Sequence, residues 1–326
     1  MILEKKLNNK DIIILDGATG SEIARLGGVM NSSAWCGVAN KTHPKIVRQV
    51  HEEYIRAGAD IITANTFSTS RHCLAGADLA EESVAITTKA VELAKEAVEN
   101  VRANRPIAIA GSMSNMVAWI PGTVSPDLRY LPTPEQELDN YRELAQTLAN
   151  SGVDIILMEM MRDIDRSTRA LTAAVETGLP VWIGTSCTLL PNGNVSAWDS
   201  LMEEPENRLS RNHVSSVENI SYNNLIEAML LFEPQVMGLM HSTVETTNAG
   251  LNTLFDYWQG PVMAYPETSS QVRKGVSQEI EPSVFARHCH DWVNKGVQII
   301  GGCCGTTIEH IRALVYELSD VISDRH

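Results

Sequence analysis

The sequence predicts a single-domain α/β protein with the (β/α)8 TIM-barrel fold, spanning residues 1–326. Short runs rich in Ile, Val and Met recur along the chain, and each is followed by a segment with the periodicity of an amphipathic helix. Apolar residues follow one another within these runs instead of alternating with polar ones, as in strands of a parallel sheet covered on both faces. Eight such strand–helix units favour a closed parallel barrel.

The elements follow one another in a regular order. The expected strands cover residues 12–16, 60–64, 107–111, 154–158, 181–186, 235–240, 262–265 and 297–300. The expected helices cover residues 43–58, 81–101, 134–152, 163–177, 221–232, 245–258, 282–295 and 307–321. Pro134 suits a first helical turn, and Gly58 and Gly152 suit helix C-termini. A doubly wound open sheet is the alternative, but the first turn reads DGATGSE where that fold often carries GxGxxG.

Two connections are too long for simple turns. They are residues 112–133, which contain three prolines, and residues 187–220, which are rich in Asn, Ser and Glu. Long loops in a compact domain are usually lids, partner contacts or disordered segments. The second loop is therefore a candidate partner contact, and the oligomeric state is left open between a monomer and a homo-oligomer.

The composition is that of a soluble globular protein, with 44% hydrophobic and 20% charged residues. The net charge is −14 and no cluster of Lys and Arg stands out, which argues against binding to nucleic acid or to an anionic membrane surface. No apolar run approaches the ~20 residues of a membrane span, and the N-terminus lacks the apolar segment of a secretory signal. We therefore expect a cytoplasmic protein whose six cysteines are free, catalytic or metal-bound.

Polar and reactive side chains gather where the expected strands end. In a (β/α)8 barrel the active site lies at the carboxyl ends of the strands, which makes this rim the candidate site. The residues at or just beyond these ends include Asp16, Asn65, Thr66, Ser112, Glu159, Thr185, Ser186, His241, Tyr265, Glu267, Cys303 and Cys304.

The sharpest motif is GGCCGTT, residues 301–307, because adjacent cysteines are rare. Consecutive Cα atoms lie only ~3.8 Å apart, which is shorter than an unstrained disulfide prefers. Thiolates of Cys303 and Cys304 on a glycine-flanked turn suit a soft metal such as zinc. The alternative is that both are small buried hydrophobic residues. A catalytic zinc also needs a third protein ligand and one open position, and His241 at the end of the sixth strand is the best candidate ligand.

Two carboxylates on the same rim could hold the ammonium group of an amino acid. They are Asp16 and Glu159, at the ends of the first and fourth strands. The alternatives are a helix cap for Asp16 and a loop salt bridge for Glu159. Trp35 could provide an apolar surface over the site, or simply pack. The candidate substrate-binding residues are then Asp16, Trp35, Asn65, Thr66, Ser112, Glu159 and Tyr265.

At these residues the chain resembles the homocysteine S-methyltransferase family. That family includes betaine- and S-methylmethionine-dependent enzymes and the homocysteine module of cobalamin-dependent methionine synthase. The resemblance covers nearly the whole chain, and the combination of its motifs is highly specific. They are LDGATGSE, Trp35 followed by HPKIVRQVHEEYIRAGADIITANTF, Gly111–Ser112, Glu159, GLMH, Tyr265–Pro266 and IIGGCCGTT.

The resemblance implies a zinc-dependent transferase on a (β/α)8 barrel, acting in methionine biosynthesis. Members bind zinc through three cysteines, and the homocysteine sulfur becomes the fourth ligand. The adjacent family cysteines match Cys303 and Cys304, and the acidic residues near the amino acid ligand match Asp16 and Glu159. No catalytic side chain is expected beyond those that hold the metal.

The chain departs from the family pattern at three places on the active face. The family usually has Asn-Cys where this sequence has Met240–His241, so one thiolate ligand is replaced by imidazole or lost. The family's GSxGP reads GSMSN, and its YPNSG reads YPETS. With His241 as ligand, zinc held by two thiolates and one imidazole is formally neutral, whereas three thiolates leave one negative charge.

These observations predict methyl transfer from a small onium donor to homocysteine or a related thiol. A quaternary ammonium donor favours an aromatic surface, for which Trp35, Trp119, Tyr130 and Trp198 are available. A folate donor would need a further domain. Two alternatives stand beside this prediction: a divergent metal hydrolase or lyase on the same barrel, and a thiol- or amino-acid-binding protein that lacks full transferase activity.

Overall fold

The computed structural model describes residues 2–31, 33–123, 125–190, 192–197, 220–268 and 280–322. In this part of the chain, eight parallel strands form one sheet in the order β1-β10-β9-β8-β5-β4-β3-β2. They are β1 (Ile13–Ile14), β2 (Ile61–Ala64), β3 (Ala108–Ser114), β4 (Ile155–Met161), β5 (Val181–Thr185), β8 (Val236–Thr243), β9 (Val262–Glu267) and β10 (Val297–Ile300). A parallel bridge between Leu15 and Ile61 joins the two edges of this sheet. The predicted (β/α)8 TIM barrel is therefore confirmed.

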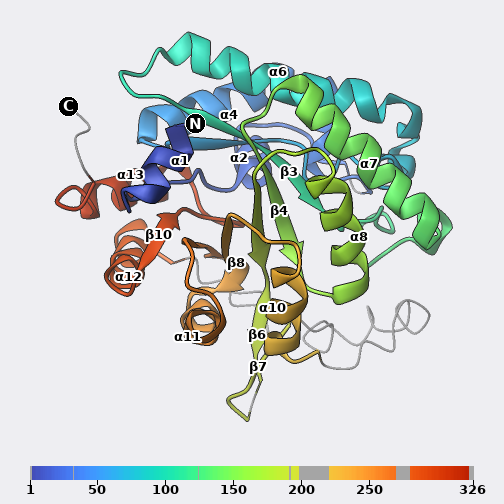
Figure 1. The fold of residues 1–326 in the computed structure, drawn as a ribbon. Coiled ribbons are helices and arrows are strands. Elements are labelled where there is room, and N and C mark those ends of the chain that lie inside the picture. The colour runs from blue at the N-terminus through green and yellow to red at the C-terminus, as the bar shows by residue number, and fades with distance from the viewer. Residues whose placement is uncertain are drawn as a thin grey trace.

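Helices surround the strands, with α6 and α7 on one side and α11 and α12 on the opposite side (Figure 1). The long helices lie where the sequence predicts them: α4 (Pro44–Ala57), α6 (Ser83–Val101), α7 (Pro134–Ser151), α8 (Ile164–Val175), α10 (Tyr222–Leu230), α11 (Val244–Tyr257), α12 (Pro282–Asn294) and α13 (Ile308–Glu317). Short helices add to them: α1 (Ile2–Asn8), α2 (Thr19–Arg25), α3 (Ala39–Thr42), α5 (Arg71–Leu74) and the 3-10 turns η1 (Cys36–Val38), η2 (Ala75–Ala77), η3 (Ala80–Glu82) and η4 (Leu128–Tyr130).

Local sequence signals fix the ends of several helices. Thr133 and Gln136 form a reciprocal capping box at the start of α7, where Pro134 occupies the first turn. Gly152 ends α7 with a φ of 76°, and Gly58 ends α4 with a φ of 115°. Both glycines adopt the left-handed conformation that side-chain-bearing residues avoid, as predicted.

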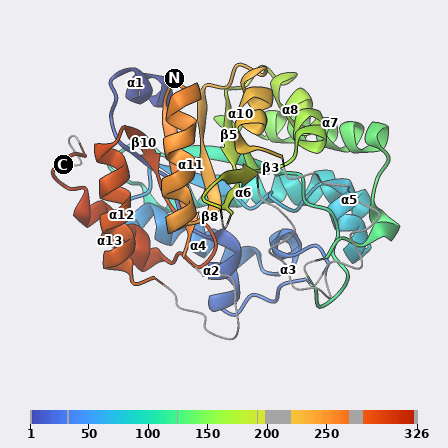
Figure 2. The same cartoon turned by 90° about the horizontal axis from the view of Figure 1, so that it is seen from below.

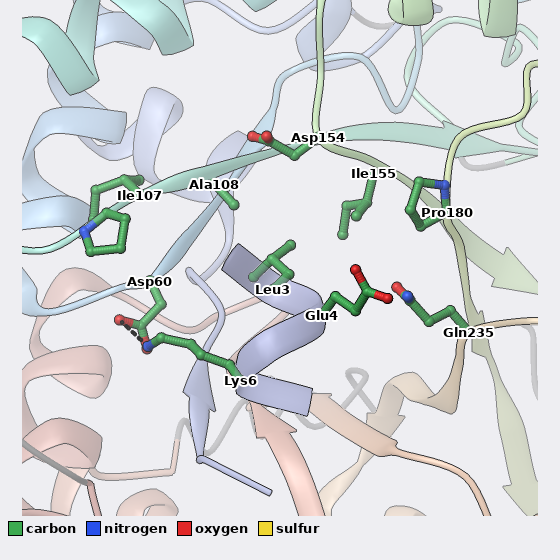
Figure 3. A pocket seen from close by; sticks show the side chains of 11 residues that line it. Leu3, Glu4, Lys6, Asp60, Ile107, Ala108, Asp154, Ile155, Pro180 and Gln235 are labelled. Carbon is green, nitrogen blue, oxygen red and sulfur yellow. Dashed lines mark ion pairs between the residues drawn. The ribbon is translucent and has the colours of Figure 1, made fainter. Parts of the chain in front are cut away.

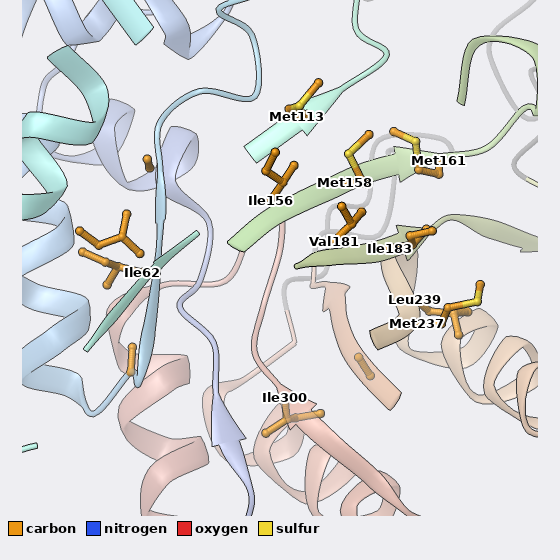
Figure 4. Packing of buried hydrophobic residues seen from close by; sticks show 14 of the residues in the cluster. Ile62, Met113, Ile156, Met158, Met161, Val181, Ile183, Met237, Leu239 and Ile300 are labelled. Carbon is orange, nitrogen blue, oxygen red and sulfur yellow. The ribbon is translucent and has the colours of Figure 1, made fainter. Parts of the chain in front are cut away.

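The strands are buried on both faces, which explains their continuous apolar runs. In β4, Ile155 and Leu157 join a cluster with inward-facing residues of the other strands. Ile156 and Met158 instead belong to the large cluster that the strands form with the surrounding helices, part of which is drawn in Figure 4. Alternate residues of each strand therefore fill the barrel and support the helices.

Helix α1 packs across the end of the barrel where the strands begin. Leu3 and Leu7 join the inward-facing cluster, and the Gln298 side chain donates hydrogen bonds to the carbonyl groups of Lys6, Leu7 and Asp11. A pocket of about 300 Å³ remains beside α1, and Lys6 pairs there with Asp60 at 3.4 Å (Figure 3). This end is closed mainly by packing, so ligands are expected at the opposite end.

The long connections leave from the carboxyl ends of the strands. The first connection, predicted at residues 112–133, begins with the last residues of β3, which extends to Ser114, and then contains η4. The second opens with an antiparallel hairpin of β6 (Cys187–Leu189) and β7 (Val195–Ala197), which projects from the barrel in Figure 1. Trp198 and the rest of that predicted loop up to residue 219 lie outside the described residues.

No described helix combines the length and the hydropathy that crossing a membrane requires. In the view of Figure 2, α11, α12 and α13 lie together at one side of the barrel, and α7, α8 and α10 lie at the other. The neighbouring helices α12 and α13 follow β9 and β10, so the last two strand–helix units pack side by side.

Candidate metal and substrate site

The structure brings the three predicted metal ligands together at the carboxyl end of the barrel. His241 lies in β8, and Cys303 and Cys304 lie directly after β10, two strands away in the sheet. The His241 Nδ1 atom lies 3.5 Å from Cys303 Sγ, and the two Sγ atoms lie 3.9 Å apart. One donor atom from each residue lies within 4.8 Å of those of the other two, so the group could hold a metal ion.

A bulge in β8 aims His241 at the cysteines. Met240 faces the barrel interior, so regular alternation would turn His241 outward toward the helices. The pairing with β9 shifts register between Met240 and Thr243, and His241 adopts a φ of 45°. The extra residue breaks the alternation and turns the imidazole toward the rim, as bulges beside active sites often do.

The cysteine turn is held by contacts that leave no room for side chains at its glycines. A Cβ at Gly301 would lie 2.7 Å from the Asp16 carbonyl oxygen, and one at Gly302 would lie 2.4 Å from Thr306. The Gly302 amide donates to Asp16 O at 3.0 Å, and the Cys303 amide donates to Pro266 O at 2.9 Å. Gly301 thus allows close approach to the residues that follow β1, and Gly302 makes room for Thr306 within the same turn, so both glycines help to fix where the sulfurs lie.

The pKa values of the two thiols are shifted in opposite directions. Cys304 accepts a hydrogen bond from Cys303, and this bond, with the nearby imidazole of His241, holds the pKa of Cys304 well below its ordinary value. Donating that hydrogen bond, together with burial, raises the pKa of Cys303 well above the usual range. Burial opposes protonation of His241, but Cys304 and Glu267 raise its pKa above the ordinary value. Cys304 is therefore the thiol that ionises first.

A fourth ionisable group, Glu267, completes this cluster. It is the last residue of β9 and only 5% exposed, and its Oε2 lies 3.7 Å from His241 Nδ1. Burial raises the pKa of Glu267 to about 7, and the charge of His241 opposes that shift. The sequence predicts Glu267 on the rim. Its contact with His241 depends on the β8 bulge, which cannot be predicted from the residue types.

Asp16 and Glu159 lie at the same rim, and within the described residues neither has the partner proposed as its alternative. Asp16 accepts hydrogen bonds from the amide and hydroxyl groups of Thr63, at 2.7 and 2.8 Å, and caps no helix. Glu159 accepts a hydrogen bond from the Ser112 hydroxyl. Burial raises the pKa of both carboxyl groups to about 7, and the charge of Asp16 adds to the shift at Glu159.

Three further candidate residues lie at or just beyond the strand ends of the same rim. The Asn65 amide donates to Cys36 O and Asn40 Oδ1, and the Thr66 hydroxyl donates to Ser112 O at 2.8 Å. These two side chains therefore brace the strand ends, and their contact with substrate stays a prediction. Tyr265 is buried beside Glu159, and among the described residues its hydroxyl has no hydrogen bond of ordinary geometry.

Aromatic rings gather around Trp35, as an apolar surface requires. Trp35 packs edge-on against Phe67, with ring centroids 5.5 Å apart, and lies 6.3 Å from Trp119. Gly20 makes room for it, because a Cβ there would lie 2.9 Å from the indole ring. Tyr130 instead packs under the Arg129 guanidinium, at 5.4 Å.

The sequence matches one protein family along most of its length. The family described as homocysteine S-methyltransferase matches residues 13–318. The chain is 27% identical to a homocysteine S-methyltransferase of Escherichia coli, over 96% of this chain and 97% of that one. It is 26% identical to a selenocysteine methyltransferase of Astragalus bisulcatus, over 94% of this chain and 92% of that one.

The fold is also similar to a solved structure. The metallated form of the homocysteine methyltransferase MmuM from Escherichia coli superposes with a TM-score of 0.71. The sequences are 21% identical, and the match covers 96% of this chain and 98% of that one. This likeness supports the barrel fold independently of the strand pattern.

Proposed function

Because the chain belongs to the homocysteine S-methyltransferase family, we propose that it transfers a methyl group from a small onium donor to homocysteine or a related thiol amino acid. The observation that carries this proposal is the group of His241, Cys303 and Cys304 at the catalytic end of the barrel. The relatives named for homocysteine and selenocysteine methylation support an acceptor with a sulfur- or selenium-bearing side chain.

Zinc is the metal we propose for this group. Two sulfurs and one imidazole nitrogen form a soft donor set, and three protein ligands are typical of catalytic zinc sites. Zinc supplies a Lewis acid that lowers the pKa of a bound thiol, so that the reactive thiolate exists at neutral pH. The turn between β10 and α13 presents the sulfurs of Cys303 and Cys304, 3.9 Å apart, for this role.

The carboxylates of Asp16 and Glu159 orient the acceptor in this proposal. An ammonium group that binds between them favours their ionised forms and offsets the effect of burial. Thr63 and Ser112 fix the two carboxylates by hydrogen bonds, so the acceptor binds in one orientation. Holding two reactants in line is a large part of catalysis in a bimolecular displacement.

Trp35, with Phe67 and Trp119, offers the donor an aromatic surface. A sulfonium or quaternary ammonium group over an aromatic face gains about 0.5–2 kcal/mol, depending on its desolvation. All three rings are half-buried, so part of each ring is exposed and open to a donor.

We also propose that the chain works as one domain in the cytoplasm. The six cysteines of the described chain are unpaired, which suits a reducing compartment. Gel filtration of the purified protein would decide between a monomer and a homo-oligomer.

Metal analysis together with a transfer assay tests the proposed function. We expect about one zinc per chain in the purified protein, and methionine as product when homocysteine and S-methylmethionine are supplied. The double variant Cys303→Ala/Cys304→Ala should lose both the metal and the activity. Cys289→Ala, which changes a buried cysteine of α12, serves as the control and should keep both.

Two results would contradict the proposal. Stoichiometric zinc in the double variant would place the metal elsewhere. Zinc binding with homocysteine affinity but no transfer from any sulfonium or quaternary ammonium donor would favour a thiol-binding protein without transferase activity.

A further inference from the structure

Glu267 lies beside the metal ligands because β8 and β9 are neighbours with an irregular register. Met240 pairs with Tyr265 and Thr243 pairs with Glu267, so two residues of β8 oppose Pro266 alone. His241 is one of those two residues, and its Nδ1 lies 3.7 Å from Glu267 Oε2. The nitrogen that faces Cys303 Sγ therefore also faces this carboxylate.

A buried carboxylate at this place needs a compensating positive charge. Among the described residues, the His241 imidazole is its ion-pair partner, and it is charged only when protonated. An imidazole that binds a metal through Nδ1 carries no proton on that atom and cannot donate from it. With a metal ion held by His241, Cys303 and Cys304, that ion would be the positive charge that compensates Glu267.

The charge of the donor set explains why a carboxylate is useful here. A divalent ion held by two thiolates and one imidazole is formally neutral, whereas three thiolates leave one negative charge. We infer that Glu267 is a charge-compensating residue of the metal centre, which supplies the negative charge that His241 does not bring. This inference rests on the proposed metal site.

Two of the three departures from the family pattern are then one coupled change. His241 stands where the family usually has cysteine, and Glu267 stands where it has asparagine, on adjacent strands. The total of the four side chains is two thiolates and one carboxylate, the same negative charge as three thiolates. The carboxylate stabilises a bound divalent ion without removing the imidazole.

The metal affinity of Glu267→Gln measures this contribution directly. Gln keeps the size of the side chain and removes its charge. We expect zinc to dissociate about 10- to 100-fold more readily, as for other residues next to metal ligands, in competition with a chromophoric chelator at fixed pH. Glu245→Gln is the matched control, because it removes a charge from an exposed position in the first turn of α11, and its affinity should equal that of the wild type.

A double-mutant cycle separates charge compensation from a merely structural role. His241→Cys supplies a third thiolate, so Glu267→Gln should cost clearly less zinc affinity in that background than in the wild type. Thermal melts of the metal-free variants show whether each one folds. Equal losses in both backgrounds, or no loss in the single variant, would overturn the inference.

The two proposals can fail separately. A folded wild-type protein that binds no zinc would overturn the proposed function and this inference together. Tight zinc binding that does not depend on Glu267 would overturn this inference alone and leave the proposed methyltransferase intact.

Discussion

His241 and Met160 share a backbone conformation that is uncommon for residues with large side chains. Their φ angles are 45° and 58°, and each lies at a register shift near the carboxyl end of its strand. Such residues cost about 1–3 kcal/mol each and persist where the surrounding structure holds them. In β4 the irregularity comprises Glu159 and Met160, and in β8 it carries the imidazole, so both irregularities lie in the candidate site.

Asp16 provides a residue-scale prediction about pH. Burial raises its pKa from 3.8 to about 7, so the folded substrate-free protein binds a proton more tightly than the unfolded chain does. The stability that this proton provides is present below about pH 4 and is lost as the pH rises through about 7. Between pH 5 and 8, the free energy of unfolding should therefore fall by roughly 2–3 kcal/mol more in the wild type than in Asp16→Asn.

Urea unfolding at both pH values checks this, with homocysteine binding measured in parallel. Asp16→Asn should also weaken homocysteine binding, because the ammonium loses a carboxylate. A wild type and a variant with the same pH dependence would show that Asp16 is ionised in the folded protein throughout this range.

At the scale of the element, the helices behave as their local sequence predicts. Period and capping signals placed the eight long helices close to their observed ends, because each packs an apolar face on the barrel. The hairpin of β6 and β7 escaped prediction, since strands of three residues have too few positions to show a period. The short helices α1 and α2 were not predicted either, because seven residues are too few to show a clear period.

The start of α7 provides an element-scale prediction. The Thr133 hydroxyl accepts a hydrogen bond from the Gln136 backbone amide, and the Gln136 side-chain oxygen accepts one from the Thr133 backbone amide. Thr133→Ala should lower the free energy of unfolding by about 1 kcal/mol, measured by urea denaturation. Thr133→Ser keeps the hydroxyl and should retain most of this stabilisation. If both variants lost the same free energy of unfolding, the stabilisation would come from the methyl group of Thr133 and not from its hydroxyl.

At the scale of the whole molecule, stability and chemistry occupy opposite ends of the barrel. Helix α1 closes the end where the strands begin, and the ionisable cluster lies where they finish. Leu7, 6% exposed, is buried in the closed end. Leu7→Ala should lower the free energy of unfolding by about 2–5 kcal/mol and leave the zinc content of the folded protein unchanged. A loss of zinc in folded Leu7→Ala would show that the two ends are coupled.

The barrel itself and the rim that carries the site could be predicted from the sequence alone. Continuous apolar strands and the CC motif are visible in residue order, and the barrel geometry places Cys303, Cys304 and His241 on one rim. That the imidazole faces the sulfurs depends on the β8 bulge. The proximity of Glu267 to His241 could not be predicted, because it depends on a one-residue shift between two strands. The bracing roles of Asn65 and Thr66 depend in the same way on which backbone atoms lie beside them.

The first strand along the chain pairs with the last, and this has a consequence for biosynthesis. Asp16 follows β1, and the two adjacent cysteines follow β10, so the site joins residues from near the beginning and near the end of the chain. A chain still on the ribosome lacks a complete donor set until β10 has emerged and paired with β1. In the proposed metal protein, the ion would therefore bind only after β10 has joined the sheet, and its binding would report that the barrel has closed.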